Sequence, residues 1–198
     1  MSSTVTSWTP DSNTKADTTS STLAVPLIMQ QYFGIQELNT AAGYHHMLCN
    51  GMMNSAPTGG TNSALGNGTD PSTSVDFSAL TNTYTEDLIA AIWYVPVDCT
   101  MTEVKVLATT DGTNSETLRF HLMQYDLDTS SNLGDLSSGT LMAYSPDISS
   151  LTADTLKVGT FTLDNPDLTA GKIVIVTVEA DDANDKASAQ VFINYKPR

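Results

Sequence analysis

The chain has little positive charge, and this shortage excludes several kinds of partner. Eight Lys and Arg residues stand against 22 Asp and Glu residues, which gives a formal net charge of −14 at pH 7. Because cationic side chains supply the affinity for nucleic acid and for anionic membranes, this balance disfavours both partners. Lys15 is the only basic residue before Lys105, so the chain also lacks the basic arm with which many coat proteins package a genome.

Cysteine, long apolar runs and catalytic motifs are equally scarce. Cys49 and Cys99 are too few for a disulfide scaffold, and we expect free thiols. No apolar run is long enough to span a bilayer, and the polar first residues lack the features of a signal peptide, which predicts synthesis in the host cytoplasm without general secretion. A Gly-x-Ser-x-Gly motif is missing, and the sequence identifies no nucleophile to partner His121, so we expect a protein that is not an enzyme.

Residues 1–40 are predicted to form a long, mostly irregular N-terminal arm. The first 24 residues are rich in Ser, Thr, Asp and Asn, and such a segment cannot offset its own ordering entropy. Residues 23–38 are more apolar but are interrupted by Pro26 and Gly34, which favours a short helical turn or an extended docking segment. An arm of this kind needs a partner's surface, although Trp8 could equally contact its own domain. The candidate docking residues are Trp8, Leu27, Ile28, Tyr32 and Phe33.

Residues 41–84 are predicted to be loop-rich, with at most one strand near residues 44–53. Residues 55–76 contain mainly Gly, Ser, Asn, Thr and Pro, a composition typical of a long loop. His45, His46 and Cys49 lie close together, but a zinc site needs four ligands and no second Cys/His pair stands at a suitable spacing. We therefore predict no metal site here and favour a partly buried polar cluster at an interface.

Residues 126–132 resemble the beginning of a calcium-binding loop. Ser131 and Ser137 occupy the positions where such a loop needs Gly and Glu, so a polar hairpin loop is the favoured interpretation. The same reasoning applies to the acidic residues 181–185. No cofactor is predicted.

Residues 85–198 have the periodicity of an antiparallel β-sandwich. The run 88–95 is apolar on both faces and ends at Pro96, which predicts a strand buried on both sides. In 101–109, Val104, Val106 and Ala108 alternate with charged residues. Further strands are expected at residues 116–125, 139–145, 156–163, 172–180 and 188–195. With one more strand from residues 44–53, an eight-stranded jelly roll is the simplest closure.

Alternation also predicts which side chains of residues 118–125 face outward. Leu118, Phe120 and Leu122 are expected to point into the sandwich, which turns the alternate positions away from it. The candidate oligomer-interface residues are His121, Met123 and Tyr125. Tyr125 and Tyr144 are also candidates for exposed aromatic side chains in a glycan-binding surface.

Three segments resemble virion proteins of tailed phages. Residues 94–104 read Tyr-Val-Pro-Val-Asp-Cys-Thr-Met-Thr-Glu-Val, a pattern similar to one in which an apolar strand ends in Pro and a short turn leads into a small jelly roll. Residues 168–175 are similar to a turn, Ala-Gly-Asp and strand segment of the same domains, with Lys172 where Asp is common. Residues 191–195 resemble their closing strand. This resemblance covers residues 85–198 and implies a homotrimeric decoration, cement or fibre protein without catalytic residues.

The expected function is therefore that of a non-enzymatic structural protein of a virion. Its arm would dock on capsid or tail proteins of the same particle, and its sandwich would be displayed. The alternative is a glycan-binding receptor-recognition module of a phage tail fibre or tip.

Overall fold

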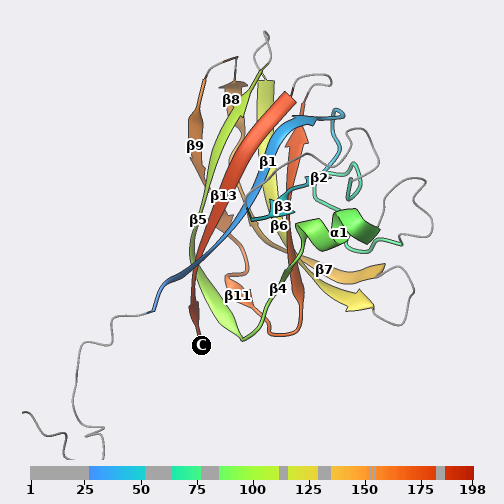
Figure 1. Cartoon of the computed structure of the whole chain (residues 1–198), viewed down its shortest axis with the longest axis vertical. Coiled ribbons are helices and arrows are strands. Elements are labelled where there is room, and N and C mark those ends of the chain that lie inside the picture. Colours follow the sequence, from blue (N-terminus) through green and yellow to red (C-terminus); the bar gives the residue numbers. More distant parts are fainter. Residues whose placement is uncertain are drawn as a thin grey trace, which may run out of the picture.

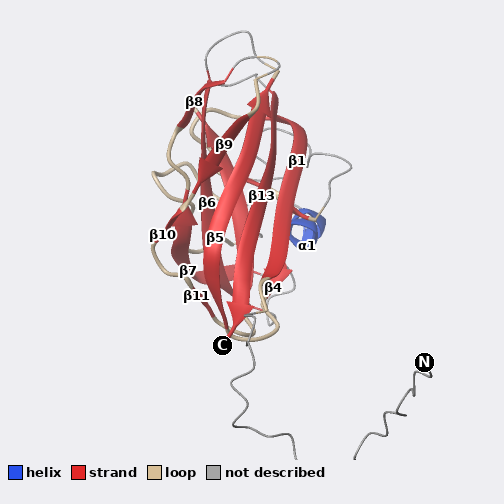
Figure 2. Ribbon diagram, turned by 90° about the vertical axis from the view of Figure 1, so that its left-hand side faces the viewer, coloured by secondary structure: helices blue, strands red, loops and turns tan. Residues whose placement is uncertain are grey.

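The chain forms an elongated β-sandwich with one short helix (Figure 1). The computed structural model describes residues 27–51, 64–76, 85–111, 116–128, 135–151, 153, 155–181 and 186–198. All named strands of this part pair in antiparallel fashion, and the longest strands follow the long axis of the molecule (Figure 2). The predicted all-β fold class is confirmed.

The strands lie in two sheets. In the first sheet, the spatial order is β11 (Asp167–Leu168), β5 (Cys99–Thr110), β13 (Lys186–Pro197), β1 (Met29–Asn39) and β3 (Cys49–Asn50), with β9 (Lys157–Thr160) also paired to β5. In the second, the order is β10 (Thr162–Leu163), β7 (Asp135–Tyr144), β6 (Glu116–Asp128), β12 (Ile173–Ala180) and β2 (His46–Met47), with β4 (Trp93–Tyr94) paired to β12 and β8 (Ile148–Leu151) to β6. The helix α1 spans Thr85–Ala91.

The connectivity is that of a jelly roll. One sheet contains the series β1-β13-β5-β9 and the other contains β2-β12-β6-β7. Early and late strands of the chain therefore alternate within each sheet, as two interleaved Greek keys require. The predicted jelly roll is confirmed, although its eight strands are not the eight that the sequence indicated.

The main core lies between the two sheets, and simple alternation identified much of it. Val104, Val106 and Ala108 on β5 are fully buried, while Lys105 between them is exposed. The inward-facing side chains of β6 and β13 follow the same period of two. The side chains predicted to point inward on β6 do so, and the alternate residues of β13 are buried with them: Leu118, Phe120, Leu122, Ala189, Val191, Ile193 and Tyr195.

A second, smaller core covers the outer face of the second sheet. Strand β12 is buried on both faces, because its sequence is apolar on both, and Ile173 and Ile175 are directed into this second core. Leu65 and Val75 from the segment 64–76, together with residues of α1, pack over them. Figure 1 shows α1 lying to one side of the sandwich, beside β2 and β3. Part of the outer face of this sheet is therefore covered by the chain's own residues.

This second core covers side chains that the sequence predicted to form an exposed oligomer interface. His121, Met123 and Tyr125 do face away from the main core, but their exposed fractions are only 2%, 1% and 0%. The Tyr125 hydroxyl donates a 2.8 Å hydrogen bond to the carbonyl of Ser72. A surface made of these three side chains is thus covered by the chain's own residues. Alternation shows which way a side chain points but not what lies above it.

The predicted strand over residues 88–95 is also corrected. Its first half belongs to α1 and only Trp93 and Tyr94 form a strand, β4. Leu88 and Ala91 are buried, whereas Ile89 is 68% exposed, which is the spacing of a helix that packs through one face. An apolar run of this length fits either a buried strand or a short helix, and periodicity alone does not separate them.

The sandwich begins at residue 29 and not at residue 85, so it includes part of the region that was predicted to be an N-terminal arm. Strand β1 begins at Met29 and pairs with β13 from Met29–Tyr195 to Asn39–Lys186. Phe33 is fully buried in the main core, so it is not available for docking. Residues 29–50 therefore belong to the jelly roll, and β2 and β3 occupy the region where one strand was predicted.

The burial of Phe33 gives a test of this boundary. Phe33→Ala should lower the free energy of unfolding by about 3–5 kcal/mol, because it removes a large buried side chain and leaves a cavity. Tyr32→Ala, on the outer face beside Phe192, should lower it by only about 0.2–1 kcal/mol, the range for a cross-strand pair. Urea unfolding of both variants measures the difference. Equal, small effects would mean that β1 is not part of the cooperative fold.

Candidate functional site

A groove lies on the outer face of the second sheet, next to the covering segment 64–76. It contains a cavity of about 360 Å³. Its lining comes from the covering segment, from β6, and from β7 with the turn that follows it: Thr69, Asp70, Arg119, His121, Leu141, Tyr144, Ser145, Pro146 and Asp147. A second cavity of about 240 Å³ shares Arg119 and Asp147 and continues to Glu179 and Asp181. The two cavities together form one elongated groove.

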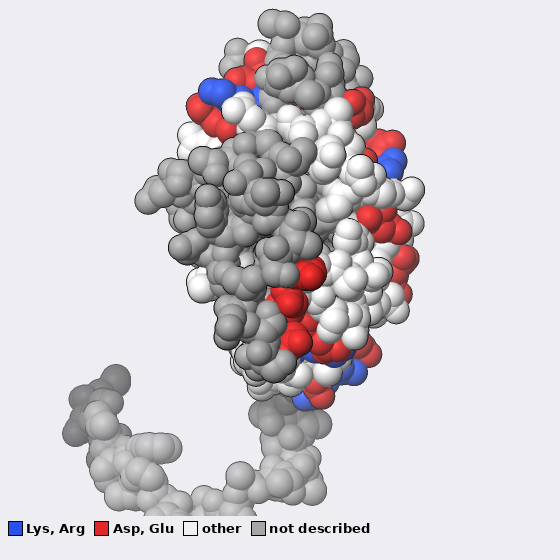
Figure 3. Space-filling model, turned by 90° about the vertical axis from the view of Figure 1, so that its right-hand side faces the viewer, with Lys and Arg blue, Asp and Glu red and all other residues white. Residues whose placement is uncertain are grey.

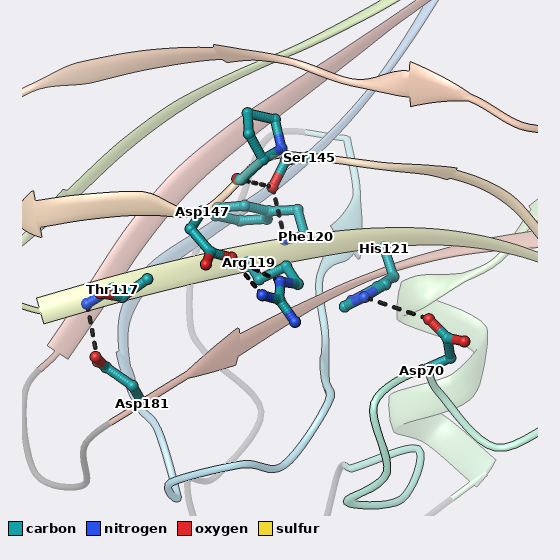
Figure 4. A network of polar contacts seen from close by, with 9 residues as sticks. Asp70, Thr117, Arg119, Phe120, His121, Ser145, Asp147 and Asp181 are labelled. Carbon is teal, nitrogen blue, oxygen red and sulfur yellow. Dashed lines mark hydrogen bonds and ion pairs between the residues drawn. The ribbon is translucent and has the colours of Figure 1, made fainter.

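Arg119 and Asp147 stand at the point where the two cavities meet (Figure 4). Nε of Arg119 donates a 2.7 Å hydrogen bond to Oδ1 of Asp147, and Nη2 lies 2.6 Å from the same oxygen. Both side chains are partly exposed, so this ion pair contributes little to stability. The ion pair instead fixes the positions of its two groups, so that a guanidinium and a carboxylate lie side by side in the wall of the groove.

Ser145 fixes the turn that carries Asp147. Its hydroxyl accepts a 3.0 Å hydrogen bond from the backbone N–H of Phe120 and donates a 2.8 Å hydrogen bond to the carbonyl of Pro146. The side chain is buried and its hydrogen is already used. Ser145 is therefore not directed toward His121, and its role in the groove is to hold β6 and the turn together.

His121 and His45 meet at the inner side of the groove. Their rings lie edge to face, with centroids 4.9 Å apart. Nε2 of His45 lies 2.8 Å from the carbonyl oxygen of Gly68, and Nε2 of His121 faces Oδ1 of Asp70 at 3.8 Å (Figure 4). Nδ1 of each ring is buried and has no hydrogen-bond partner among the described residues. Burial, followed by the charges of His45 and Arg119, lowers the pKa of His121 from 6.5 to about 3.

Glu179 completes a group of possible metal ligands with these two histidines. One ligand atom from each of His45, His121 and Glu179 lies within 4.8 Å of the others. Glu179 belongs to β12, two residues after Thr177, which stands directly opposite His121 in the sheet. Residues two apart on a strand share a face, so all these side chains gather on the same side of the sheet.

His46 and the cysteines, which the sequence placed near a polar cluster, lie apart from this group. Nε2 of His46 accepts a 2.9 Å hydrogen bond from the backbone N–H of Ala41. Cys49 and Cys99 are both buried and are not joined in a disulfide, and burial raises the pKa of Cys99. The predicted cluster of His45, His46 and Cys49 therefore separates, and its first member joins residues from β6 and β12 instead.

The predicted docking residues also fall into different places. Leu27 and Ile28 are 69% and 59% exposed, Tyr32 is 37% exposed, and Phe33 is in the core. Trp8 lies outside the described residues. The groove residues that the sequence did not single out are Asp70, Asp147 and Glu179. A signal for Glu179 was present, because Thr177 and Glu179 interrupt the apolar outer positions of β12.

Among the charged side chains of the described surface, acidic ones predominate. Figure 3 shows Asp and Glu in patches at the lower part and along the margin of one face, with few Lys or Arg beside them. In the groove, Arg119 supplies a positive charge among several carboxylates. No helix in the described ranges is long and apolar enough to cross a membrane.

Comparisons with known proteins identify no family for this chain. No family model matches the sequence, and no curated protein matches it. Among solved structures, the chain is similar to the CBM22-1–GH10 modules of Clostridium thermocellum endo-1,4-beta-D-xylanase 10B complexed with xylohexaose, at 13% identity and a TM-score of 0.28. The match covers 54% of this chain and 18% of that chain, so the chain corresponds to a small part of that protein.

The buried histidines predict a loss of stability in acid. Burial lowers the pKa of His46 from 6.5 to about 4. The His46 ring is therefore protonated at a higher pH in the unfolded chain than in the folded chain. The free energy of unfolding falls as the pH drops below about 6.5, because acid then favours the unfolded chain. At about 1.4 kcal/mol per unit, His46 should account for a loss of about 2–3 kcal/mol between pH 7 and pH 4.5.

Urea unfolding at both pH values, on the wild type and on His46→Gln, measures this contribution. The variant should be less stable at pH 7 but should lose less stability in acid, since Gln does not titrate. Parallel losses in the two proteins would show that His46 does not carry the effect.

Proposed function

We propose that this chain is a non-enzymatic structural protein of a virion, which docks on capsid or tail proteins at one end and displays a jelly roll. The observation that carries this proposal is the position of its exposed apolar residues. Leu27 and Ile28 directly precede β1, which begins at the end of the sandwich where the C-terminus also lies (Figure 1). Strand β1 begins there, since Met29 stands opposite Tyr195.

This arrangement supports attachment by one end. The three consecutive side chains of residues 27–29 are exposed and apolar, and such a group is typical of a contact surface. Because the long strands follow the axis of the sandwich, docking at this end directs the opposite end away from the particle (Figure 2). The acidic surface keeps copies apart until specific contacts form. The sequence resemblance to phage virion proteins is the second support.

The docking residues can be tested directly. The double variant Leu27→Asp, Ile28→Asp should fold normally, because both side chains are exposed, but should no longer bind particles, because it places charges in an apolar contact. The measurement is co-sedimentation of the purified chain with virus particles from which the protein has been removed.

The matched control is Leu156→Asp, Val158→Asp. These two side chains are 65% and 64% exposed, and they lie in and before β9, away from the proposed docking end. The control should bind particles like the wild type. Light scattering on the full chain tests the homotrimer that the resemblance implies, at three times the 21.1 kDa chain mass. A protein that is found on no particle, or two double variants that bind equally, would contradict the proposal.

The groove favours a second candidate function, recognition of a host glycan by the displayed module. Sugar hydroxyls both donate and accept hydrogen bonds, and the Arg119–Asp147 pair offers donors and an acceptor side by side. Tyr144 adds a partly exposed aromatic ring to the same wall. A concave site with a few fixed polar groups and an aromatic side chain is typical of small-ligand binding. This candidate is compatible with a virion protein that also contacts the host.

Binding of oligosaccharides tests this candidate. The probe is a panel of neutral and acidic oligosaccharides on the wild-type chain. For any sugar that binds, Arg119→Ala should weaken binding by about 10- to 100-fold, the equivalent of a lost hydrogen bond to a charged group. Tyr144→Ala should also weaken it, whereas Tyr94→Ala, which removes a 61% exposed tyrosine elsewhere, should not. No binding across the panel would rule this function out.

A further inference from the structure

We propose that His45, His121 and Glu179 bind a divalent transition-metal ion of the Zn²⁺ type. The three residues come from three separate elements: the segment before β2, strand β6 and strand β12. Their ligand atoms lie within 4.8 Å of one another. Two imidazoles and a carboxylate form a donor set that Zn²⁺ accepts, with a fourth position left for another ligand.

The surroundings of the two rings favour a hydrogen on Nε2 of each. A carbonyl oxygen only accepts, so Nε2 of His45 must carry the hydrogen that it shares with Gly68. The carboxylate of Asp70 lies 3.8 Å from Nε2 of His121, too far for a hydrogen bond, but its negative charge favours a hydrogen on that nitrogen. In a neutral imidazole the other nitrogen, Nδ1, then has a free lone pair. This arrangement, with the outer nitrogen bound to a carbonyl or a carboxylate, is the one found around metal-binding histidines.

His46 shows the opposite arrangement. Its Nε2 accepts the N–H of Ala41, so Nδ1 carries the hydrogen and has no lone pair for a metal ion. Two adjacent histidines in one short segment are therefore held in opposite tautomers. Of the two, only the one with a free Nδ1 meets His121.

Unpaired polar atoms mark the same place. Nδ1 of His45, Nδ1 of His121 and Oγ1 of Thr177 are buried and make no hydrogen bond within the described part of the chain. Thr177 stands directly opposite His121. Buried polar atoms without partners are rare and costly, and three of them at one point indicate an occupant. A cation satisfies the two nitrogen lone pairs directly.

The geometry allows the site to close around an ion. Zn²⁺ holds nitrogen and oxygen ligands at about 2.0–2.2 Å, so the three atoms must approach one another from their present limit of 4.8 Å. Glu179 is only partly buried, so its side chain can move toward the two rings. His121 lines one cavity of the groove and Glu179 lines the other, so the fourth coordination position faces the groove.

Titration with the metal alone tests the proposal. The full chain, free of any histidine tag and stripped with a chelator, should bind one Zn²⁺ per chain by calorimetry. In ¹⁵N NMR spectra, Zn²⁺ should shift the Nδ1 resonances of His45 and His121 and leave those of His46 in place. This readout separates ligation from a purely structural role of the two rings.

Three variants refine the test. Glu179→Gln keeps the shape of a partly exposed side chain and should weaken Zn²⁺ binding by at least about 10-fold, because it removes an anionic ligand. Asp70→Asn should weaken it by about 10- to 100-fold through His121. The matched control is Glu103→Gln, a partly buried glutamate on a strand of the other sheet, which should bind like the wild type. All three substitutions are at positions that leave the core intact.

Two results would overturn the proposal. One is a wild-type chain that binds no Zn²⁺ at these residues, which would leave the three unpaired atoms to buried water. The other is Glu179→Gln binding as tightly as the wild type, which would assign the bound ion to surface carboxylates. Neither result bears on docking through Leu27 and Ile28, so the metal site and the proposed virion role fail or succeed separately.

Discussion

The ladder between β1 and β13 is the constraint on which the rest of the structure depends. It makes the first and last long strands neighbours and places Phe33 in the core. Without it, β13 would be an edge strand and the core would open along one side. The same strand leads the chain into β2 on the opposite sheet and back to β3 beside β1. That short crossing brings His45 over β6, so the closure of the sandwich also builds the inner wall of the groove.

The sequence was informative where strands keep a strict period of two, and it was misleading where they do not. The inward residues keep a period of two over residues 104–110 of β5, 116–122 of β6 and 187–195 of β13, and these inward faces were predictable. In β5 the period breaks between Met101 and Val104, where the register against β13 shifts. In β1 the inward residues are Phe33, Ile35 and Leu38, because a bulge between Ile35 and Leu38 shifts the register. The inward residues are therefore two positions apart from Phe33 to Ile35, on either side of Gly34, and three positions apart from Ile35 to Leu38. This irregular spacing, among residues that are largely polar, hides the strand from a search for strict alternation.

The groove could not be assembled from spacing, because its residues meet only through the topology. His45, His121 and Glu179 lie far apart in the chain, and no local motif connects them. What brings them together is the order β2-β12-β6 in the second sheet, together with the turn at Gly68 that holds His45 over it. Local pattern reveals a polar interruption such as Glu179, whereas the identity of its neighbours depends on strand order, which alternation does not encode.

Strand β1 begins beside the end of β13, and the two strands are antiparallel. The resistance of the sandwich to mechanical force therefore depends on the direction of the pull. A pull on Leu27 along the long axis acts in shear, since it loads the hydrogen bonds from Met29 to Asn39 at the same time. A pull that separates Leu27 from Arg198 instead opens the ladder one pair at a time, beginning at Met29 and Tyr195. A module held by one end and dragged by flow from the other experiences the first kind of load, which is the kind that this strand order withstands best.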